Sequence, residues 1–463
     1  MDLTARDVVA AAGGEIVSGP IDARITSFSI DSRTLTPGAC FVALEAERDG
    51  HAYVGDAIAR GAAAAIVRVP VDITADGPTE PAVIRVADPL VALTEIARLV
   101  RDHLADVTVV GVTGSAGKTA TKDLTAAALA PTLRVHASPA SFNNEAGLPL
   151  TLLGAPDDVA VIVAEMGARF SGNIRDLAAI ARPQIGIVTH VGWAHAEYLM
   201  GRTGIAKVKG ELLEALPADG LAVLNAGCDA TPALARRTDA RVVTVGRDSD
   251  AEVVISGISL DEELRPTFSL SSPWGSLSAT LGVRGEHQVE NAAMAAVVAL
   301  HLGAPLDSVA AGLASARGAL QRMDLTRMPD GVVVINDAYN SSPTSAVAAV
   351  RSLARLPVEG RRIAVLGEML ELGAHADDGY TAVGDAVASG HIDVLVAVGE
   401  ALRPLVDAAR HEGLTVHRVH DVDDATALLL GEVRAGDAVL VKASRAVGLE
   451  RVAEALVERE PAT

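Results

Sequence analysis

A glycine-rich segment, Thr113-Gly-Ser-Ala-Gly-Lys-Thr119, directly follows the apolar run Val107 to Val112. A short buried strand that ends in such a turn and continues into a helix forms a cradle for a polyphosphate. Backbone N–H groups of the turn converge on phosphate oxygens, Lys118 neutralises the outer phosphates, and the hydroxyl of Thr119 can ligate Mg²⁺. We expect the helix to span residues 120–130. This segment therefore favours an α/β sheet with the loop at the carboxyl end of one strand.

The spacing of the segment differs from that of the common P-loop, in which a glycine stands five residues before the Gly-Lys pair. That pattern would place the glycine at Val112, whereas this chain has Gly111, one residue earlier. From the segment alone, a glycine-rich turn that binds nothing remains an open alternative.

Length and composition narrow the classes of protein. The chain has 463 residues, which is enough for about three domains. Its net charge of −20 argues against a nucleic-acid or anionic-membrane binder, because those partners require a basic face. Hydrophobic residues make up 49% but aromatic residues only 2%, so the cores consist of Ala, Val and Leu, as in buried parallel sheets.

The cysteine content and the two ends of the chain bear on its location. The two cysteines, Cys40 and Cys228, are far apart and are typical of small buried side chains in a reducing compartment. No basic segment followed by an apolar one opens the chain, and no run of 18 apolar residues occurs. We expect a cytoplasmic protein without membrane insertion.

The apolar runs divide the chain into three segments, 1–105, 106–318 and 319–463. In each segment strand-like runs alternate with helix-length stretches, so the fold class is α/β. We expect a smaller N-terminal α/β domain, a central doubly wound, mainly parallel sheet with an antiparallel edge at 252–284, and a Rossmann-like C-terminal domain. The expected strands are residues 25–30, 40–44, 64–67, 83–86, 107–112, 159–164, 185–189, 221–224, 242–245, 332–335, 363–366, 394–398 and 438–441.

Polar residues that follow these strands are candidates for chemistry, because ligands bind at the carboxyl ends of parallel strands. Glu165 could hold Mg²⁺ or be a salt-bridged surface residue. His195 could ligate a metal or contact phosphate, although a single histidine is more often structural. Lys207 and Lys209 would by composition form a solvated basic face.

Further candidate functional residues lie at and after the junction of the second and third segments. Arg322 could reach a γ-phosphate or form a salt bridge between domains. Asp337-Ala-Tyr-Asn340 follows a strand and precedes a helix with Pro343 in its first turn, so a turn or cap explains much of it.

Together these residues resemble the Mur ligase family over essentially the whole chain. The shifted glycine loop is that family's version, and six further residues follow the family's order and spacing: Glu165, His195, Lys209, Asn291, Arg322 and Asp337. Each motif alone is weak, whereas the whole series is specific.

Within the family, the signatures resemble those of the members that add D-alanyl-D-alanine to UDP-N-acetylmuramoyl-tripeptide. They are Ser141-Phe-Asn-Asn144, Glu165-Met-Gly167, Asp337-Ala-Tyr-Asn340, Gly367-Glu-Met-Leu-Glu-Leu-Gly373, Asp31-Ser-Arg33 and Asp49-Gly-His51. The chain departs at His190, where the family often has Asn, and at Ser341 and Ser342, where Ala-Asn is common. No role is therefore assigned to His190, and the dipeptide contacts near Ser341 stay open.

The resemblance implies an amide ligation driven by ATP through an acyl phosphate, which gives the pentapeptide precursor of peptidoglycan, ADP and phosphate. It assigns ATP binding to Thr113, Gly114, Ser115, Ala116, Gly117, Lys118, Thr119, Asn291, Arg322 and Asp337. It assigns Mg²⁺ to Thr119, Glu165, His195 and Lys209, the last as a carbamate, and catalysis to Lys118, Lys209, His195 and Arg322. It assigns substrate binding to Ser32, Arg33, Asp49, Gly50, His51, Asn143, Asn144, Tyr339 and Asn340.

Two other readings stay open at this stage. The chain could be another ligase of the same superfamily, of the folylpolyglutamate or cyanophycin type, although the segments at 141–151 and 367–373 disfavour it. It could also be a nucleotide-binding regulatory protein without turnover, although such a protein needs no second metal site. We expect the protein to be monomeric.

Overall fold

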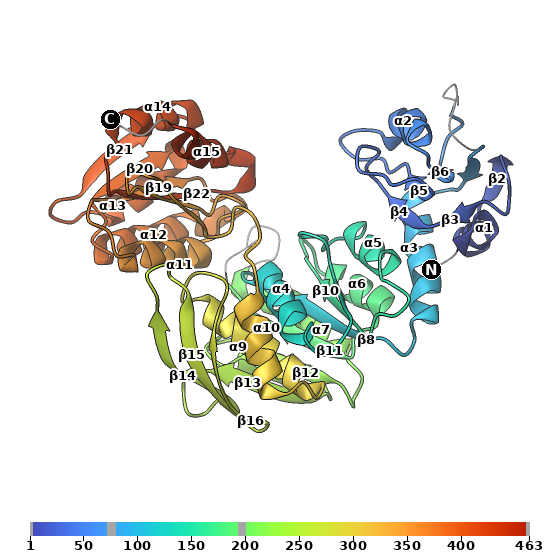
Figure 1. The fold of residues 1–463 in the computed structure, drawn as a ribbon, viewed down its shortest axis with the longest axis horizontal. Helices are drawn as coiled ribbons and strands as arrows, with labels where there is room; N and C mark the ends of the chain where they lie inside the picture. The colour runs from blue at the N-terminus through green and yellow to red at the C-terminus, as the bar shows by residue number, and fades with distance from the viewer. Residues whose placement is uncertain (1–2, 72–79, 193–200, 460–463) are drawn as a thin grey trace. The chain divides into compact units, whose positions relative to one another are not determined.

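The structure is a computed structural model that describes residues 3–71, 80–192 and 201–459. Contacts divide the chain into two compact units. The first unit comprises Met1–Gly111, Leu133–Ala168 and Gly172–Ile185, and the second comprises Val112–Thr132, Arg169–Ser171 and Gly186–Thr463. In the described residues, three large sheets with helices on them confirm the α/β fold class, and β1 and β3 form a further two-stranded antiparallel sheet; Figure 1 shows these elements. The three-domain division stays a prediction.

The N-terminal part of the first unit is built on a five-stranded sheet in the order β2-β7-β6-β5-β4. The strands β4 to β7 are parallel, and β2 is antiparallel to β7. Its elements are β1 (Leu3–Thr4), α1 (Ala5–Ala12), β2 (Glu15–Ser18), β3 (Arg24–Ile25), β4 (Ser27–Ser29), β5 (Ala39–Val42), η1 (Gly50–Tyr53), α2 (Val54–Ala59), β6 (Ala64–Val67), β7 (Ala82–Arg85) and α3 (Pro89–His103).

The central sheet has nine strands in the order β16-β15-β14-β13-β12-β11-β8-β10-β9. Its β14–β15 and β15–β16 pairs are antiparallel, which confirms the predicted edge at 252–284. Its elements are β8 (Thr108–Thr113), α4 (Lys118–Leu129), β9 (Val135–Ala137), α5 (Gly147–Leu153), β10 (Val161–Glu165), α6 (Asn173–Ala181), β11 (Ile185–Val188), α7 (Gly201–Glu214), β12 (Leu221–Asn225), α8 (Thr231–Ala235), β13 (Arg241–Gly246), β14 (Val253–Leu260), β15 (Pro266–Ser272), β16 (Gly275–Thr280), α9 (Gln288–His301) and α10 (Leu306–Ser315).

The C-terminal sheet has six strands in the order β17-β18-β22-β19-β20-β21, parallel except for β17. Separate apolar clusters cover its two faces, one under α11 to α13 and the other under α14 and α15 (Figure 1). Its elements are β17 (Asp324–Arg327), β18 (Val333–Asn336), α11 (Pro343–Arg355), β19 (Arg362–Gly367), η2 (Gly373–His375), α12 (Ala376–Ser389), β20 (Val394–Val398), η3 (Glu400–Leu402), α13 (Arg403–Ala408), β21 (Thr415–Val419), α14 (Val422–Glu432), β22 (Ala438–Lys442), η4 (Arg445–Val447) and α15 (Glu450–Glu458).

The strand β22 has an ion pair at each end, and one partner of each pair is buried. Asp437, just before it, accepts from the Arg361 guanidinium at 2.7 Å, and Lys442, its last residue, contacts Asp337 at 2.7 Å. Burial alone would raise the pKa of Asp437, but the Arg361 guanidinium and nearby backbone N–H groups lower it. Asp437 is therefore an anion at neutral pH and anchors the beginning of the strand.

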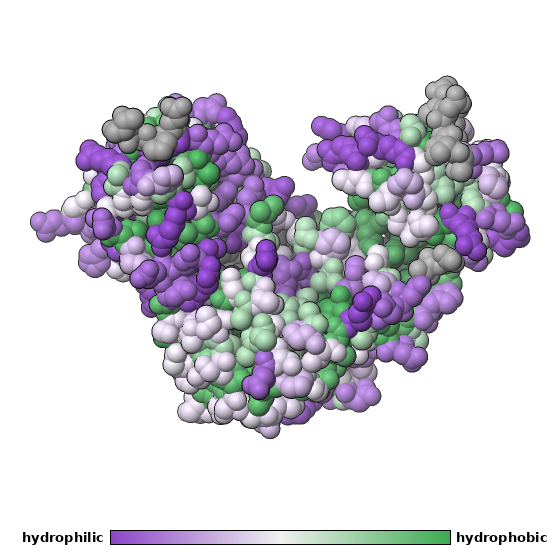
Figure 2. Space-filling view, in the orientation of Figure 1, coloured by the Kyte–Doolittle hydropathy of each residue, from purple (hydrophilic) through white to green (hydrophobic). Residues whose placement is uncertain are grey.

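Part of the surface is strongly hydrophilic. Hydrophilic side chains, in purple, are spread over the visible face of the segment that holds α12 to α15 (Figure 2). Among the described residues, no helix is both long enough and apolar enough to span a membrane.

Two predictions about the elements need correction. The helix after the glycine loop begins at Lys118, not at residue 120, because Gly117 adopts the left-handed conformation and ends the loop there. The short strands β1, β2, β9, β17 and β21 were not predicted, since each is brief or interrupted by polar residues.

Candidate active site

The glycine loop connects β8 to α4 in the second unit. Thr113 ends the strand, and Lys118 and Thr119 occupy the first helical turn. The first N–H groups of a helix have no intrahelical partner, so this turn offers donors and a positive dipole end to an anion. Gly117 has φ +82° and precedes the helix. Lys118 donates from Nζ to the carbonyl oxygen of Gly114 at 2.9 Å, which keeps its ammonium over the loop.

The segment that follows β11 holds the loop in shape. The hydroxyl of Thr189 donates to the carbonyl oxygen of Ala116 at 2.5 Å, and its N–H donates to Thr113 at 2.9 Å. A Cβ on Gly114 would overlap Thr189 Oγ1, so position 114 must be glycine. The N–H of Ser115 donates to the carbonyl oxygen of His190 at 2.8 Å, so His190 contributes its backbone to the loop.

Sequence reasoning missed Thr189. The available signal was a hydroxyl residue at the carboxyl end of a predicted strand, but its role depends on which strand end lies beside the loop. The order of the strands in the sheet cannot be read from the sequence alone.

Asn291 lies against the other end of the loop. A Cβ on Gly117 would lie 2.7 Å from Asn291 Oδ1, so the asparagine side chain fills the space that glycine leaves. Asn291 Nδ2 donates to Gln288 Oε1 at 2.9 Å, one turn earlier on α9. The structure thus places this predicted ATP residue at the loop.

Arg322 reaches the loop from the third segment of the sequence. Its Nη2 donates to Thr119 Oγ1 at 3.1 Å. The guanidinium stacks on the Tyr339 ring, 4.2 Å from the centroid, and Arg445 lies 5.0 Å from the same centroid. Between the two readings left open for Arg322, this contact favours the one that reaches the phosphate loop.

Asp337 is held by a lysine that sequence reasoning did not identify. Lys442 Nζ donates to Asp337 Oδ2 at 2.7 Å and to the carbonyl oxygen of Asn340 at 2.8 Å. Asp337 Oδ1 accepts from the N–H of Met323 at 3.1 Å. Burial lowers the pKa of nearby His287. The positive charge of Lys442 also lowers this pKa, whereas the negative charge of Asp337 raises it, and the net effect is a lowered pKa.

Ser342, one of the two serines that differ from the family pattern, has a structural role. Ser342 caps α11, with its hydroxyl accepting from the N–H of Ser345 and its own N–H donating to the Ser345 hydroxyl at 2.9 Å. Pro343 occupies the first turn, as predicted.

Burial distinguishes the two lysines of α7. Lys209 is 1% exposed, whereas Lys207 is exposed. A lysine that is only a solvated basic side chain would lie on the outside, as Lys207 does, because burying an ammonium is costly. The interior position of Lys209 therefore agrees with a specific role for that residue.

The first unit contains the predicted carboxylate. Glu165, the last residue of β10, is 1% exposed, and its Oε1 accepts from Asn143 Nδ2 at 2.8 Å. Its Oε2 has no hydrogen-bond partner within the described part of the chain. A buried carboxylate oxygen left without a donor suits a cation, and Mg²⁺ prefers oxygen ligands. The side chain of Asn144 instead accepts from the N–H of Gly147 at the start of α5 (2.8 Å).

The predicted N-terminal substrate residues form two small clusters in the same unit. The Arg33 guanidinium pairs with Asp31 at 2.7 Å and lowers the pKa of that carboxyl to about 2, while Ser32 between them is buried. His51 Nδ1 contacts Asp49 Oδ1 at 2.6 Å.

The tautomer of His51 follows from its second contact. His51 Nε2 accepts from the N–H of Arg68 at 2.9 Å, so the ring carries its proton on Nδ1 and donates it to Asp49. Gly50 begins the 3₁₀ turn that presents the histidine.

His195, predicted as a metal ligand and catalytic residue, lies outside the described residues. Where the chain is described, no three His, Cys, Asp or Glu side chains are grouped so that they could hold a metal ion. Besides His195, the expected ligand set consists of the Thr119 hydroxyl, Glu165 and Lys209 as a carbamate, and it stays a prediction.

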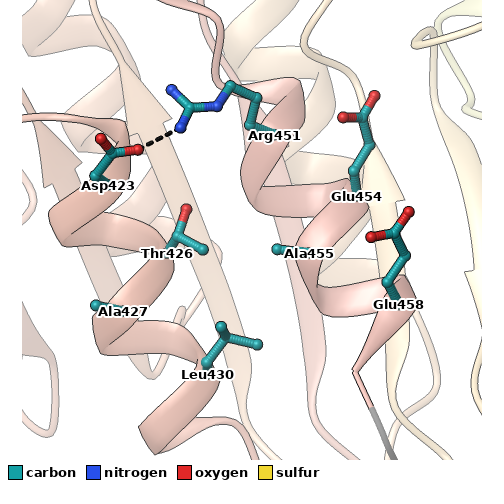
Figure 3. Close-up of a pocket in the computed structure, with 8 residues that line it drawn as sticks. All are labelled: Asp423, Thr426, Ala427, Leu430, Arg451, Glu454, Ala455 and Glu458. Atoms are coloured by element: carbon teal, nitrogen blue, oxygen red, sulfur yellow. Dashed lines mark hydrogen bonds and ion pairs between the residues drawn. The ribbon is translucent and has the colours of Figure 1, made fainter.

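A groove of about 460 Å³ lies between α14 and α15. Figure 3 shows Arg451 of α15 reaching across to Asp423 at the start of α14. Glu454 and Glu458 also line the groove, and none of the predicted site residues in the described part of the chain does. Because its carboxylates would repel phosphate groups, the groove is unsuited to a nucleoside triphosphate.

Comparison with known families identifies two domains that contain the residues of the glycine loop and its neighbours. Residues 112–299 match the Mur ligase middle domain, and residues 321–445 match the Mur ligase glutamate ligase domain. The chain belongs to the Mur ligase family. The middle-domain match includes the glycine loop, Lys209 and Asn291, and the second match includes Arg322 and Asp337.

Individual Mur ligases are similar over nearly the full length. The UDP-N-acetylmuramoyl-tripeptide–D-alanyl-D-alanine ligase of Mycobacterium tuberculosis is 41% identical, covering 99% of this chain and 98% of that one. The Escherichia coli enzyme of the same name is 33% identical, covering 96% and 97%. Among solved structures, MurF from Acinetobacter baumannii has a TM-score of 0.86 at 28% identity, covering 99% of both chains. MurF ligase from Thermotoga maritima in complex with ADP has a TM-score of 0.77 at 28% identity, covering 93% and 97%.

The close approach of Gly117 to Asn291 gives a prediction. Gly117→Ala should weaken ATP binding, because the new methyl group would push Asn291 from the loop, besides a backbone cost of about 1–2 kcal/mol for a left-handed alanine. Gly303→Ala is the matched control, since Gly303 has φ +85° and open space around its Cβ position. Calorimetric titration with ATP should show weaker binding only for Gly117→Ala. Equal affinities in the two variants would contradict the role of the contact.

Proposed function

We propose that this protein is an ATP-dependent ligase that joins D-alanyl-D-alanine to UDP-N-acetylmuramoyl-tripeptide. The observation that carries the proposal is the Arg322–Thr119 contact, which joins the two family-matched segments at the phosphate loop. The names of relatives that are 41% and 33% identical over almost the whole chain supply the reaction.

The chemistry has two steps. A carboxylate oxygen of the tripeptide attacks the γ-phosphorus of ATP, the bond to the bridging oxygen breaks, and ADP leaves. The amine of D-alanyl-D-alanine then attacks the acyl carbon, phosphate leaves, and the nitrogen loses a proton. Both partners in the first step are anions, so neutralising charge is the main catalytic requirement. In this proposal, Lys118 and Arg322 supply the positive charge.

The nucleotide proposal covers the loop residues 113–119, Asn291 and Asp337. It is supported by the loop geometry and by the ADP complex of the Thermotoga maritima enzyme. We further propose that Mg²⁺ is held by Thr119, Glu165, His195 and carbamylated Lys209, for which the unpartnered Glu165 oxygen is the structural support. When bound, Mg²⁺ neutralises phosphate charge.

The substrate proposal assigns the UDP end to Ser32, Arg33, Asp49, Gly50 and His51. Asn143, Asn144, Tyr339 and Asn340 would contact the peptide substrates. Two of these side chains have local contacts as well: Asn143 binds Glu165, and Tyr339 stacks on Arg322. Mutations there therefore affect the metal and phosphate regions in addition to the substrates.

Location and assembly are further proposals. Cys40 and Cys228 are both buried free thiols, as expected in a reducing compartment. We propose that the enzyme acts in the cytoplasm as a monomer.

Other ligases of the superfamily are less similar. Mycobacterium tuberculosis folylpolyglutamate synthase has a TM-score of 0.61 at 18% identity, a likeness that extends to the fold alone. A nucleotide-binding regulator without turnover is the remaining alternative, and a turnover assay separates it from a ligase.

The test is a phosphate-release assay with single omissions. Release should require ATP, UDP-N-acetylmuramoyl-tripeptide and D-alanyl-D-alanine together, and fall to background when any one is omitted. Glutamate or single D-alanine should not replace the dipeptide. Release that proceeds without the dipeptide would overturn the assignment, and absence of release under all conditions would favour the regulator.

A further inference from the structure

Lys442 is a buried cation at the carboxyl end of β22, outside the residues assigned to the site above. Its side chain is 2% exposed. Its ammonium donates to Asp337 Oδ2 at 2.7 Å and to the carbonyl oxygen of Asn340 at 2.8 Å. A buried ammonium is costly unless it is paired and hydrogen-bonded, and these two contacts meet that requirement.

Asp337, which Lys442 holds in place, is hydrogen-bonded in turn to the segment around Arg322. Its second oxygen, Oδ1, accepts from the N–H of Met323 at 3.1 Å. The N–H of Tyr339 donates to the carbonyl oxygen of Gln321 at 3.2 Å. Arg322 is therefore fixed on both sides by hydrogen bonds to the segment that Lys442 holds.

The backbone of this segment needs such support. Gln321 has φ 58° and Met323 has φ 51°, so both neighbours of Arg322 adopt the left-handed conformation that side chains other than glycine disfavour. Such conformations persist only where surrounding contacts hold them. Between them, Arg322 extends to Thr119 Oγ1 at 3.1 Å.

We propose that Lys442 is a positioning residue for the ligase reaction: it fixes Asp337, and Asp337 in turn holds the 321–323 segment so that Arg322 points at the phosphate loop. This inference rests on the proposed function for its effect on turnover. Without the ammonium, the Asp337 carboxylate loses its counter-ion and its fixed orientation, and the bond to Met323 weakens. The Arg322 guanidinium keeps its charge, but its side chain is no longer held toward Thr119 and the phosphate loop.

The opposite end of the same strand provides a matched control. Arg361 pairs with buried Asp437 at 2.7 Å, so Arg361→Met removes the cation from a partly buried ion pair at the start of β22, and Lys442→Met removes the cation from the pair at its end. Among the described residues, the hydrogen bonds that Arg361 donates go to Asp437 and to the carbonyl oxygen of Glu432, and not to the Arg322 segment or the glycine loop. A general loss of stability should therefore appear in both variants, and a positioning effect only in Lys442→Met.

The first measurement is amide hydrogen exchange of the 319–325 peptide, which does not depend on the reaction. Lys442→Met should speed exchange there by about tenfold or more, because the Met323 N–H loses its fixed acceptor. Arg361→Met should leave that peptide unchanged. Unchanged exchange in Lys442→Met would overturn the proposal, whatever the enzyme's substrates prove to be.

The second measurement is steady-state turnover. Lys442→Met should lower kcat by about 10- to 100-fold, as loss of a supporting partner commonly does, with a smaller change in the KM for ATP. Lys442→Arg keeps the charge and should recover part of kcat. In an Arg322→Ala background, Lys442→Met should add less than twofold, because its effect passes through Arg322.

The outcomes separate the two proposals. If the wild-type protein shows no dipeptide-dependent phosphate release, the proposed function fails, and hydrogen exchange still decides the role of Lys442. Equal losses in Lys442→Met and Arg361→Met, or full additivity with Arg322→Ala, would show a merely structural lysine. If Lys442→Met does not fold, Lys442→Gln, which removes the charge but keeps a polar side chain, is compared with wild type in the same two measurements, and unaltered exchange and kcat in that variant would contradict the proposal.

Discussion

Lys209→Ala is expected to lose nearly all ligase activity, and formate or acetate is expected to restore part of it. An ammonium cannot ligate a metal, whereas a carbamate formed from the neutral amine and CO₂ offers anionic oxygens. Lys209 is also only 1% exposed, which is not the position of a solvated basic side chain. We expect kcat to fall by about 10³-fold, the upper end of what loss of one electrostatic group costs. Phosphate release with and without added carboxylate measures both effects.

Lys207→Ala is the matched control, because Lys207 lies on the same helix two residues earlier and is exposed. It should keep near-normal activity. A carbamate signal in ¹³C NMR after equilibration with ¹³CO₂ should be present in Lys207→Ala and absent in Lys209→Ala. Full activity of Lys209→Ala, or a carbamate signal that survives in it, would refute the modification.

Much of the fold is predictable from the sequence because buried parallel strands are continuous apolar runs. The runs at 221–224 and 394–398 are β12 and β20, with the same or nearly the same bounds. In contrast, β21 reads Thr-Val-His-Arg-Val, with polar residues inside it, and lies at the edge of its sheet. An edge strand needs little burial, so its apolar signal is weak.

The candidate site is predictable to a lesser degree, and the difference has a physical cause. Lys118, Thr119 and Asn291 belong to motifs that are local in sequence, and the structure brings them to one loop. Thr189 and Lys442 act through neighbours that are 73 and 105 residues away. Their roles depend on which strand ends are adjacent, and that order follows from long-range packing rather than from any local pattern.

Arg322→Ala is expected to lower kcat by about 10²–10³-fold while the KM for ATP stays within about threefold, since this charge is needed most in the transition state. The guanidinium bonds Thr119 Oγ1 at 3.1 Å and is oriented by the Tyr339 ring. Arg445→Ala is the comparison, because Arg445 stacks on the same ring at 5.0 Å and should cost less than tenfold. Steady-state assays at varied ATP separate kcat from KM. A large rise in KM with unchanged kcat would instead place Arg322 in ground-state binding, and equal losses in the two variants would mean that the Tyr339 stack, rather than the charge at the loop, is what matters.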